Sequence, residues 1–196
     1  MLHFKMGRYI RCILEKKKWE EKTLSIFYTV HTKEAWIQFQ KAGYLTGSRE
    51  HVRDELLEAY HWMMKQMAKR LPRYEGEYPI WLYTQFPDHY RYTMEKGLEC
   101  VLLAVELREE DVLISDFETW HCVLNQWYLL WEDEDEDHPP LSMEESWERI
   151  FELERLQSDP MWKSSDPMYQ GVTGKIPVKQ VKSVTDFIAE EEEDNE

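Results

Sequence analysis

The chain has 196 residues, of which 42% are hydrophobic and 14% are aromatic. This composition excludes a disordered chain and suits one folded domain. The formal net charge of −15 disfavours nucleic acid as a partner of the main domain, because an acidic body repels phosphate groups.

Cysteine spacing and hydropathy exclude further classes of protein. Three cysteines without a CxxC spacing argue against a disulfide framework and against the usual zinc sites, so we expect no metal centre. No run of about 18 apolar residues occurs, which argues against a membrane-spanning helix. We therefore expect a cytoplasmic protein; composition leaves its oligomeric state open.

The charge is divided unevenly along the chain. Residues 1–22 hold seven Lys and Arg against three Glu, a net charge of +4, which leaves −19 for the rest. We expect a basic extension over 1–23, which is either solvated or bound to an anionic partner. A single domain is predicted over 24–188, followed by an acidic, disordered tail over 189–196.

The first predicted elements are a strand and a helix. Residues 24–31 are rich in β-branched and aromatic types, which predicts a strand. Thr32 is a suitable N-cap for the helix that follows, and Gly43 is a suitable stop. The pattern therefore indicates a strand–turn–helix unit.

A longer helix is predicted next, followed by two strands. Apolar side chains recur every three or four residues from Val52 to Leu71, and Ser48 offers a cap at the start. Residues 79–86 and 100–107 are predicted strands, and the second is apolar on both faces.

The second half of the domain is predicted to mix short strands with capped helices. A strand over 112–114 precedes Ser115 and Glu118, which form a capping box for a helix that reaches about Trp131. Carboxylates at the start of a helix are stabilised by the positive end of the helix dipole. Their presence here therefore needs no catalytic role.

An acidic loop over 132–141 is expected after this helix, because six consecutive carboxylates repel one another and are solvated. Ser142 and Glu145 form a second capping box, for a helix to about Leu156. Two short strands are predicted over 168–188. Because strands and helices mix without βαβ alternation, we expect an α+β fold, with small mixed or antiparallel sheets packed against about four helices.

Aromatic side chains provide the candidate binding residues. If they converge, they would wall a pocket that stacks on a planar ligand such as a nucleobase. No nucleotide, metalloprotease or hydrolase motif is present, so the sequence leaves open whether the protein is an enzyme. The four candidates are Tyr28, Trp81, Tyr83 and Trp120.

Several segments spread over residues 25–188 carry a family resemblance. They are residues 28–32, 35–36, 62–63, 66–67, 69–70, 78–81, 112–117 and 123–125, with Trp120. Together they resemble a family of uncharacterised bacterial proteins, found largely in Firmicutes and known only as a domain of unknown function. The resemblance supports the domain and implies no activity.

A second resemblance concerns the order of the elements. The opening strand, its helix and Gly43, together with residues 169–177, are similar to the layout of ADP-ribosyltransferase-like domains. That resemblance implies NAD bound in a cleft between two small sheets, a His or Arg on the first strand, and an acidic residue near the late strands. In this chain His31 and Gln170 are the corresponding candidates. Gln170 departs from the family, because a neutral amide stabilises an oxocarbenium-like transition state less well than a carboxylate.

Two hypotheses of function follow. In the first, the domain binds a nucleotide such as NAD, or is ADP-ribosyltransferase-like, with Tyr28, His31, Trp81 and Gln170 near the cleft. In the second, the protein is a non-enzymatic, acidic interaction protein, associated with a phage or mobile element. Its acidic surface would then bind a basic protein or mimic nucleic acid.

Overall fold

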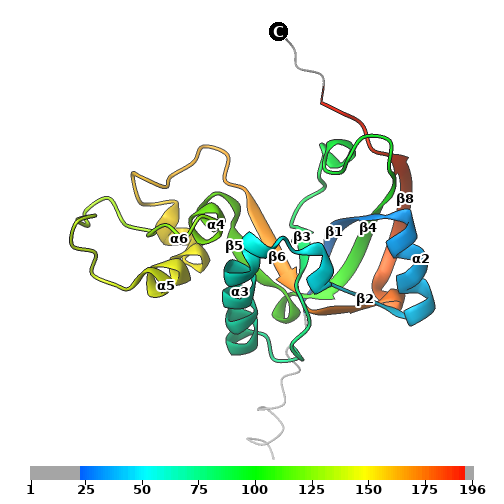
Figure 1. The fold of residues 1–196 in the computed structure, drawn as a ribbon, viewed down its shortest axis with the longest axis horizontal. Helices are drawn as coiled ribbons and strands as arrows, with labels where there is room; N and C mark the ends of the chain where they lie inside the picture. The colour runs from blue at the N-terminus through cyan, green and yellow to red at the C-terminus, as the bar shows by residue number, and fades with distance from the viewer. Residues whose placement is uncertain (1–22, 193–196) are drawn as a thin grey trace, which may run out of the picture.

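The computed structural model describes residues 23–192, so the predicted basic extension lies outside the described residues except for Thr23. Two antiparallel sheets organise the chain, one with the strand order β5-β6-β3-β1-β4-β8 and one that pairs β2 with β7 (Figure 1). The large sheet contains β1 (Leu24–Thr32), β3 (Ile80–Tyr83), β4 (Glu99–Arg108), β5 (Leu113–Asp116), β6 (Tyr169–Thr173) and β8 (Val181–Ile188). The small sheet contains β2 (Tyr44–Thr46) and β7 (Lys175–Pro177). The predicted α+β class is confirmed.

The opening strand and helix form as expected. The Thr32 side chain accepts a hydrogen bond from the backbone N–H of Ala35, and α2 (Lys33–Ala42) begins there. Gly43 ends the helix with φ 83°, a left-handed conformation that glycine adopts without steric cost.

The next helix starts later than predicted. Ser48 does cap a turn, but that turn is a single 3₁₀ turn over Arg49–His51. The chain then becomes extended at Val52 and Arg53 and makes a second 3₁₀ turn before α3 (Leu57–Arg70) begins. The apolar periodicity therefore predicts the helix correctly only within α3. The extended backbone at Val52 and Arg53 separates the turn capped by Ser48 from that helix.

The prediction of a long helix after β5 was wrong at both ends. Asp116 caps α4 (Phe117–Leu124), since its carboxylate accepts from the backbone N–H and the hydroxyl of Thr119 at 2.8 and 2.9 Å. Ser115 belongs to β5 instead. The chain leaves the helix at Gln126, whose φ is 56°, and continues without regular structure to Trp131.

The remaining elements are also more divided than predicted. The capping box of Ser142 and Glu145 is present, but the helix that it opens is broken into α5 (Met143–Ser146), a 3₁₀ turn over Trp147–Phe151 and α6 (Leu153–Leu156). The two closing strands expected over 168–188 are three: β6, β7 and β8.

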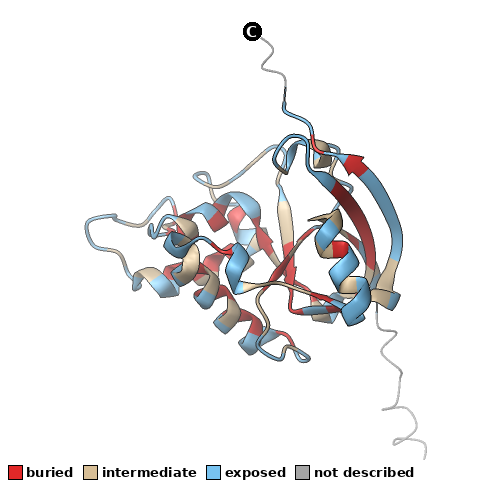
Figure 2. Cartoon of the chain, turned by 45° about the vertical axis from the view of Figure 1, so that its right-hand side comes forward, coloured by how far each residue is buried: buried red, intermediate tan, exposed pale blue. Residues whose placement is uncertain are grey.

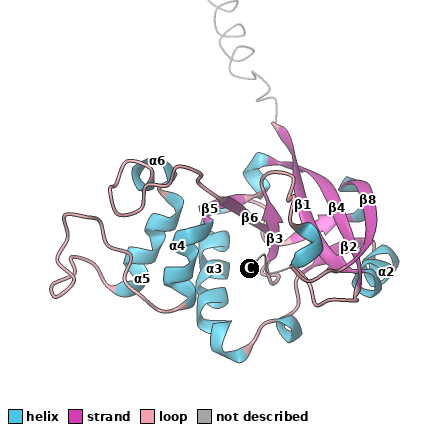
Figure 3. Cartoon of the chain, turned by 90° about the horizontal axis from the view of Figure 1, so that it is seen from above, coloured by secondary structure: helices cyan, strands magenta, loops and turns pink. Residues whose placement is uncertain are grey.

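Both faces of the large sheet are covered. The helices α3 to α6 gather at the β5–β6 end, and α2 lies at the other end (Figures 1 and 3). One core cluster joins these helices to Leu113 and Val172, and a second joins α2 and the small sheet to β1, β3 and β4. β4 is the most continuously buried strand, as expected from its apolar run (Figure 2). No helix among the described residues is long and apolar enough to cross a membrane.

The acidic segment 132–137 is not uniformly solvated, and the expectation of a purely solvated loop is corrected at one position. Glu134 turns inward and pairs with Arg149, Nη2 to Oε1 at 2.7 Å, and the two side chains are 17% and 7% exposed. Arg149 also donates to the carbonyl of Leu129. The hydrogen bond from Arg149 lowers the pKa of Glu134. One acid of the run therefore anchors the loop to the helical core.

This anchor predicts unequal effects of neutralising neighbouring acids. Glu134→Gln leaves Arg149 buried without its counter-charge, so it should lower the free energy of unfolding by roughly 3 kcal/mol. Glu136→Gln, at an exposed position of the same run, should change it by less than about 0.5 kcal/mol. Urea denaturation measures both values. Equal effects of the two substitutions would contradict the anchoring role.

Candidate functional site

Four side chains form a row across one face of the large sheet. Tyr28 of β1 is in register with Tyr83 of β3, Tyr83 with Gln170 of β6, and Gln170 with Ser115 of β5. Residues directly opposite in antiparallel strands stand on the same face with Cβ atoms about 5 Å apart. We call these four residues the row; it brings together three residues singled out from the sequence.

The row lies where the sheet divides. β1 and β3 are joined at one register pair, Tyr28 with Tyr83, whereas β1 pairs with β4 along its whole length. The two halves of the sheet, β5-β6-β3 and β1-β4-β8, therefore meet at these two tyrosines. Tyr83 is 38% exposed and Ser115 is fully buried. Tyr28 and Gln170 are half-buried, so the row is only partly open to a ligand.

An aromatic cluster borders the row on its helical side. Trp81 stands on the same face as Tyr83, because it lies two residues earlier on the strand. Its ring centroid is 4.9 Å from that of Trp120. Its indole N–H donates to the hydroxyl of Tyr60 at 3.1 Å. Trp81 and Trp120 are thus in contact, but they are held against α3 and α4 as part of the core.

The loop over residues 84–98 borders the row on the other side. The ring of Phe86 meets Tyr28 edge to face at 5.4 Å, and Phe86 is 53% exposed. Burial raises the pKa of Tyr83, and the neighbouring Thr93 side chain lowers it by less. Tyr90 packs between Phe86 and Phe187. The loop therefore contacts both tyrosines of the row.

Hydrogen bonding leaves the Gln170 amide weakly engaged. Its Nε2 lies 3.5 Å from the hydroxyl of Ser115, at the outer limit of a hydrogen bond. A primary amide carries two donors and one acceptor oxygen, so Gln170 can pair with the polar edge of a ligand. The hydroxyls of the two tyrosines add further donors and acceptors. The row can therefore bind a planar ligand by stacking and by hydrogen bonds.

His31 lies on the opposite face of the sheet. It is three residues beyond Tyr28 on the same strand, so its side chain points away from the row. Its Nε2 lies 3.1 Å from Thr29 Oγ1, and its ring meets Phe39 of α2 edge to face. Burial, with a smaller contribution from His51, lowers the pKa of His31 to about 4. The structure therefore does not bring His31 together with Gln170.

Sequence reasoning missed Tyr60, Phe86 and Ser115 as neighbours of the candidate residues. Tyr60 belongs to the apolar pattern between Val52 and Leu71, which predicts a core position. That pattern does not indicate that its hydroxyl contacts Trp81. Ser115 was read as a helix cap. Phe86 was placed at the end of a predicted strand, whereas β3 ends at Tyr83. Aligning the predicted strands so that Gln170 faces Ser115 could have identified Ser115 as a neighbour.

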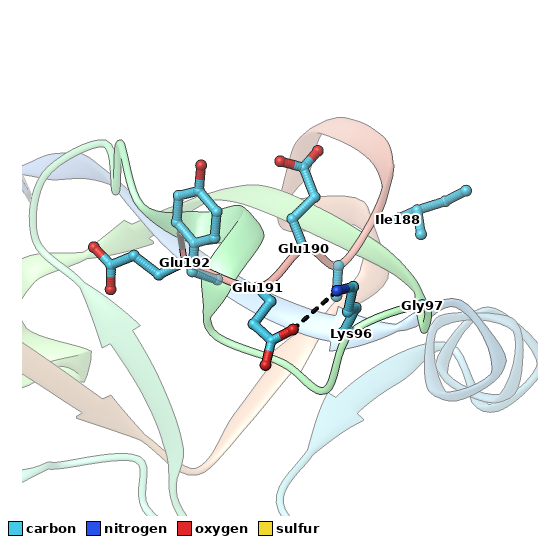
Figure 4. Close-up of a pocket in the computed structure, with 8 residues that line it drawn as sticks. Lys96, Gly97, Ile188, Glu190, Glu191 and Glu192 are labelled. Atoms are coloured by element: carbon cyan, nitrogen blue, oxygen red, sulfur yellow. Dashed lines mark hydrogen bonds and ion pairs between the residues drawn. The ribbon is translucent and has the colours of Figure 1, made fainter. Parts of the chain in front are cut away.

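A hollow at another place on the surface is distinct from the row. A hollow of about 550 Å³ is lined by residues of the 84–98 loop and of the C-terminal segment, including Lys96, Gly97 and Glu191 (Figure 4). Within residues 23–192, no group of three or more His, Cys, Asp or Glu side chains could hold a metal ion.

The low pKa of His31 predicts a pH dependence of stability. The folded state holds His31 neutral down to about pH 4, whereas an unfolded histidine is protonated below about 6.5. The contribution of neutral His31 to the free energy of unfolding is therefore complete above pH 6.5. It is lost as the pH falls to 4, by at most about 3 kcal/mol.

The variant His31→Gln isolates this contribution, because it has no titrating group at that position. Chemical denaturation at pH 7 and at pH 4 should show a smaller loss of stability in the variant than in the unaltered chain. Parallel losses in the two proteins would mean that His31 titrates normally in the folded state.

Comparison with known proteins agrees with the first family resemblance. No curated protein matches the chain. A family model described as a domain of unknown function (DUF3841) matches residues 26–139, which is more than half of the chain. The matched part includes most of β1 and all of β3, β4, β5 and α4, and with them Tyr28, Tyr83 and Ser115; Gln170 lies outside it. The chain belongs to this family of uncharacterised domains, DUF3841.

Proposed function

We propose that the protein is a cytoplasmic nucleotide-binding domain, with NAD as the candidate ligand, and that it holds the ligand on the row. The alignment of Tyr28, Tyr83 and Gln170 across three strands carries the proposal. Stacking of a base on an aromatic side chain is worth about 1–3 kcal/mol. A carboxamide beside the tyrosines supplies donors and an acceptor for the edge of the base or of a nicotinamide amide.

The division of the sheet supports an ADP-ribosyltransferase-like layout. Domains of that kind bind NAD between two small sheets, and here two three-stranded halves meet at Tyr28 and Tyr83. None of the four positions in the row has a carboxylate. The nearby Asp116 is buried and accepts hydrogen bonds from Thr119. Binding without transfer is therefore the activity that these residues favour, since a neutral amide gives little charge stabilisation to an oxocarbenium-like state.

A thermal-shift measurement tests the binding. NAD at about ten times its dissociation constant should raise the melting temperature by about 3 °C, because a ligand that binds only the folded state stabilises it. Tyr83→Leu and Gln170→Ala should each remove most of this shift. Tyr128→Leu is a matched control, because Tyr128 is 39% exposed and Tyr83 is 38% exposed.

Two results would count against the proposal. If millimolar NAD, AMP and nicotinamide all leave the melting temperature unchanged, the row is not a nucleotide site. If the protein releases nicotinamide from NAD, a catalytic group is present and the binding-only reading is wrong.

A second candidate function rests on the acidic segment. Five of its six carboxylates are exposed, and only Glu134 is held inward. Exposed acids of one sign attract a basic partner and accelerate its binding. We therefore propose, as the alternative, that this surface binds a basic protein.

Charge neutralisation tests the alternative. Replacing the five exposed acids with Asn or Gln should weaken binding of a lysine-rich peptide by about tenfold or more at low salt. Five matched replacements elsewhere on the surface should weaken it less, in the same titration. Equal losses would show that only the total charge matters. The replaced acids are Glu132, Asp133, Asp135, Glu136 and Asp137.

A further inference from the structure

The chain continues past β8 as an ordered strap over residues 189–192, which were expected to belong to a disordered tail. Ala189 is only 2% exposed. Its carbonyl accepts from the N–H of Gly97 at 2.8 Å, and its own N–H donates to the carbonyl of Leu98 at 2.9 Å. The N–H of Glu190 donates to the carbonyl of Arg91 at 2.8 Å. The strap is thus bound by its backbone to the 84–98 loop.

Two ion pairs reinforce these backbone bonds. Arg91 pairs with Glu190 at 3.0 Å. Lys96 pairs with Glu191 at 2.9 Å, as Figure 4 shows. The hydrogen bond from Lys96 lowers the pKa of Glu191. All four side chains are exposed, so salt screens both pairs. Salt can therefore release the two glutamates, whereas Ala189 belongs to the buried cluster around Phe187 and is held there by its backbone.

The same loop contacts the row on its other side. Phe86 packs on Tyr28, and the Thr93 side chain lies close to Tyr83. Tyr90 joins the loop to Phe187 of β8, 4.8 Å between ring centroids. Apart from the 3₁₀ turn at Tyr90–Tyr92, the loop has no regular structure. Segments of this kind open at low free-energy cost, so whatever anchors them controls their opening.

We propose that residues 189–192 are a latch that holds the 84–98 loop against the row, so that release of the strap frees the loop and gives a ligand access to Tyr28 and Tyr83. This regulation rests on the proposed function of the row. Glu190 and Glu191 are the positioning residues, because they act on the ligand surface only through Arg91 and Lys96. High ionic strength, or a cationic partner that competes for the two glutamates, would release the latch.

Amide hydrogen exchange of the full-length protein, without ligand, tests the latch itself. The double variant Glu190→Gln, Glu191→Gln should exchange the amides of residues 84–98 about fivefold faster at low salt, and the difference should disappear at about 1 M salt. A chain that ends at Ile188 should exchange them faster still, because it also lacks the three backbone hydrogen bonds. The control Glu136→Gln, Glu154→Gln removes the same charge at exposed positions and should leave the loop unchanged.

The possible results separate the latch from the proposed function. Unchanged exchange in both strap variants would overturn the latch, whatever the ligand binding shows. Faster exchange across the whole domain, β4 included, would mean that the strap is only a part of the fold and would also overturn it. NAD association should be several-fold faster in the double variant than in the charge control. If NAD binds none of the proteins, the proposed function of the row fails, while the exchange data still decide whether the strap holds the loop.

Discussion

The pairing of Tyr28 with Tyr83 is the contact on which the arrangement of this protein depends. It is the one register pair between β1 and β3, and it joins the two halves of the sheet on the face that carries the row. On the opposite face one buried cluster spans β1, β3 and β4. The half with β5 and β6 packs on the helices α3 to α6, whereas β4 and β8 pack on the 84–98 loop. A sheet joined so narrowly leaves aromatic side chains at its centre only partly covered, and those are the residues that a ligand can reach.

The sequence predicted this fold well wherever one local signal decided the structure. The alternation and β-branched residues of 24–31, the Thr32 cap and Gly43 specify β1 and α2 without help from the rest of the chain. The same is true of the apolar run that becomes β4. These local patterns determine where each element begins and ends and which side chains it buries, whereas the hydrogen-bond partners of β1 lie far along the chain, on β3 and β4.

Prediction failed where tertiary contacts override local signals. The stretch after α4 has aromatic residues at helical spacing, but Trp131 and Leu129 are buried by leaving the helix and packing beside Arg149. The row could be predicted only as a set of residue types, because register between strands 50 or more residues apart is fixed by the packing of both faces. Tyr28, Tyr83 and Gln170 converge for that reason. His31 lies on the other face, because side chains alternate along β1 and His31 is three residues after Tyr28.

The distribution of charge connects the row to its surroundings. The row itself is neutral, with two hydroxyphenyl rings, an amide and a hydroxyl, so it favours stacking and hydrogen bonding over charge stabilisation. Arg91 and Lys96 of the bordering loop are paired with the C-terminal glutamates. In the proposed latch, these two pairs hold the loop that borders the row. Ligand binding and release of the strap would then favour each other, because both require the 84–98 loop to move away from the row.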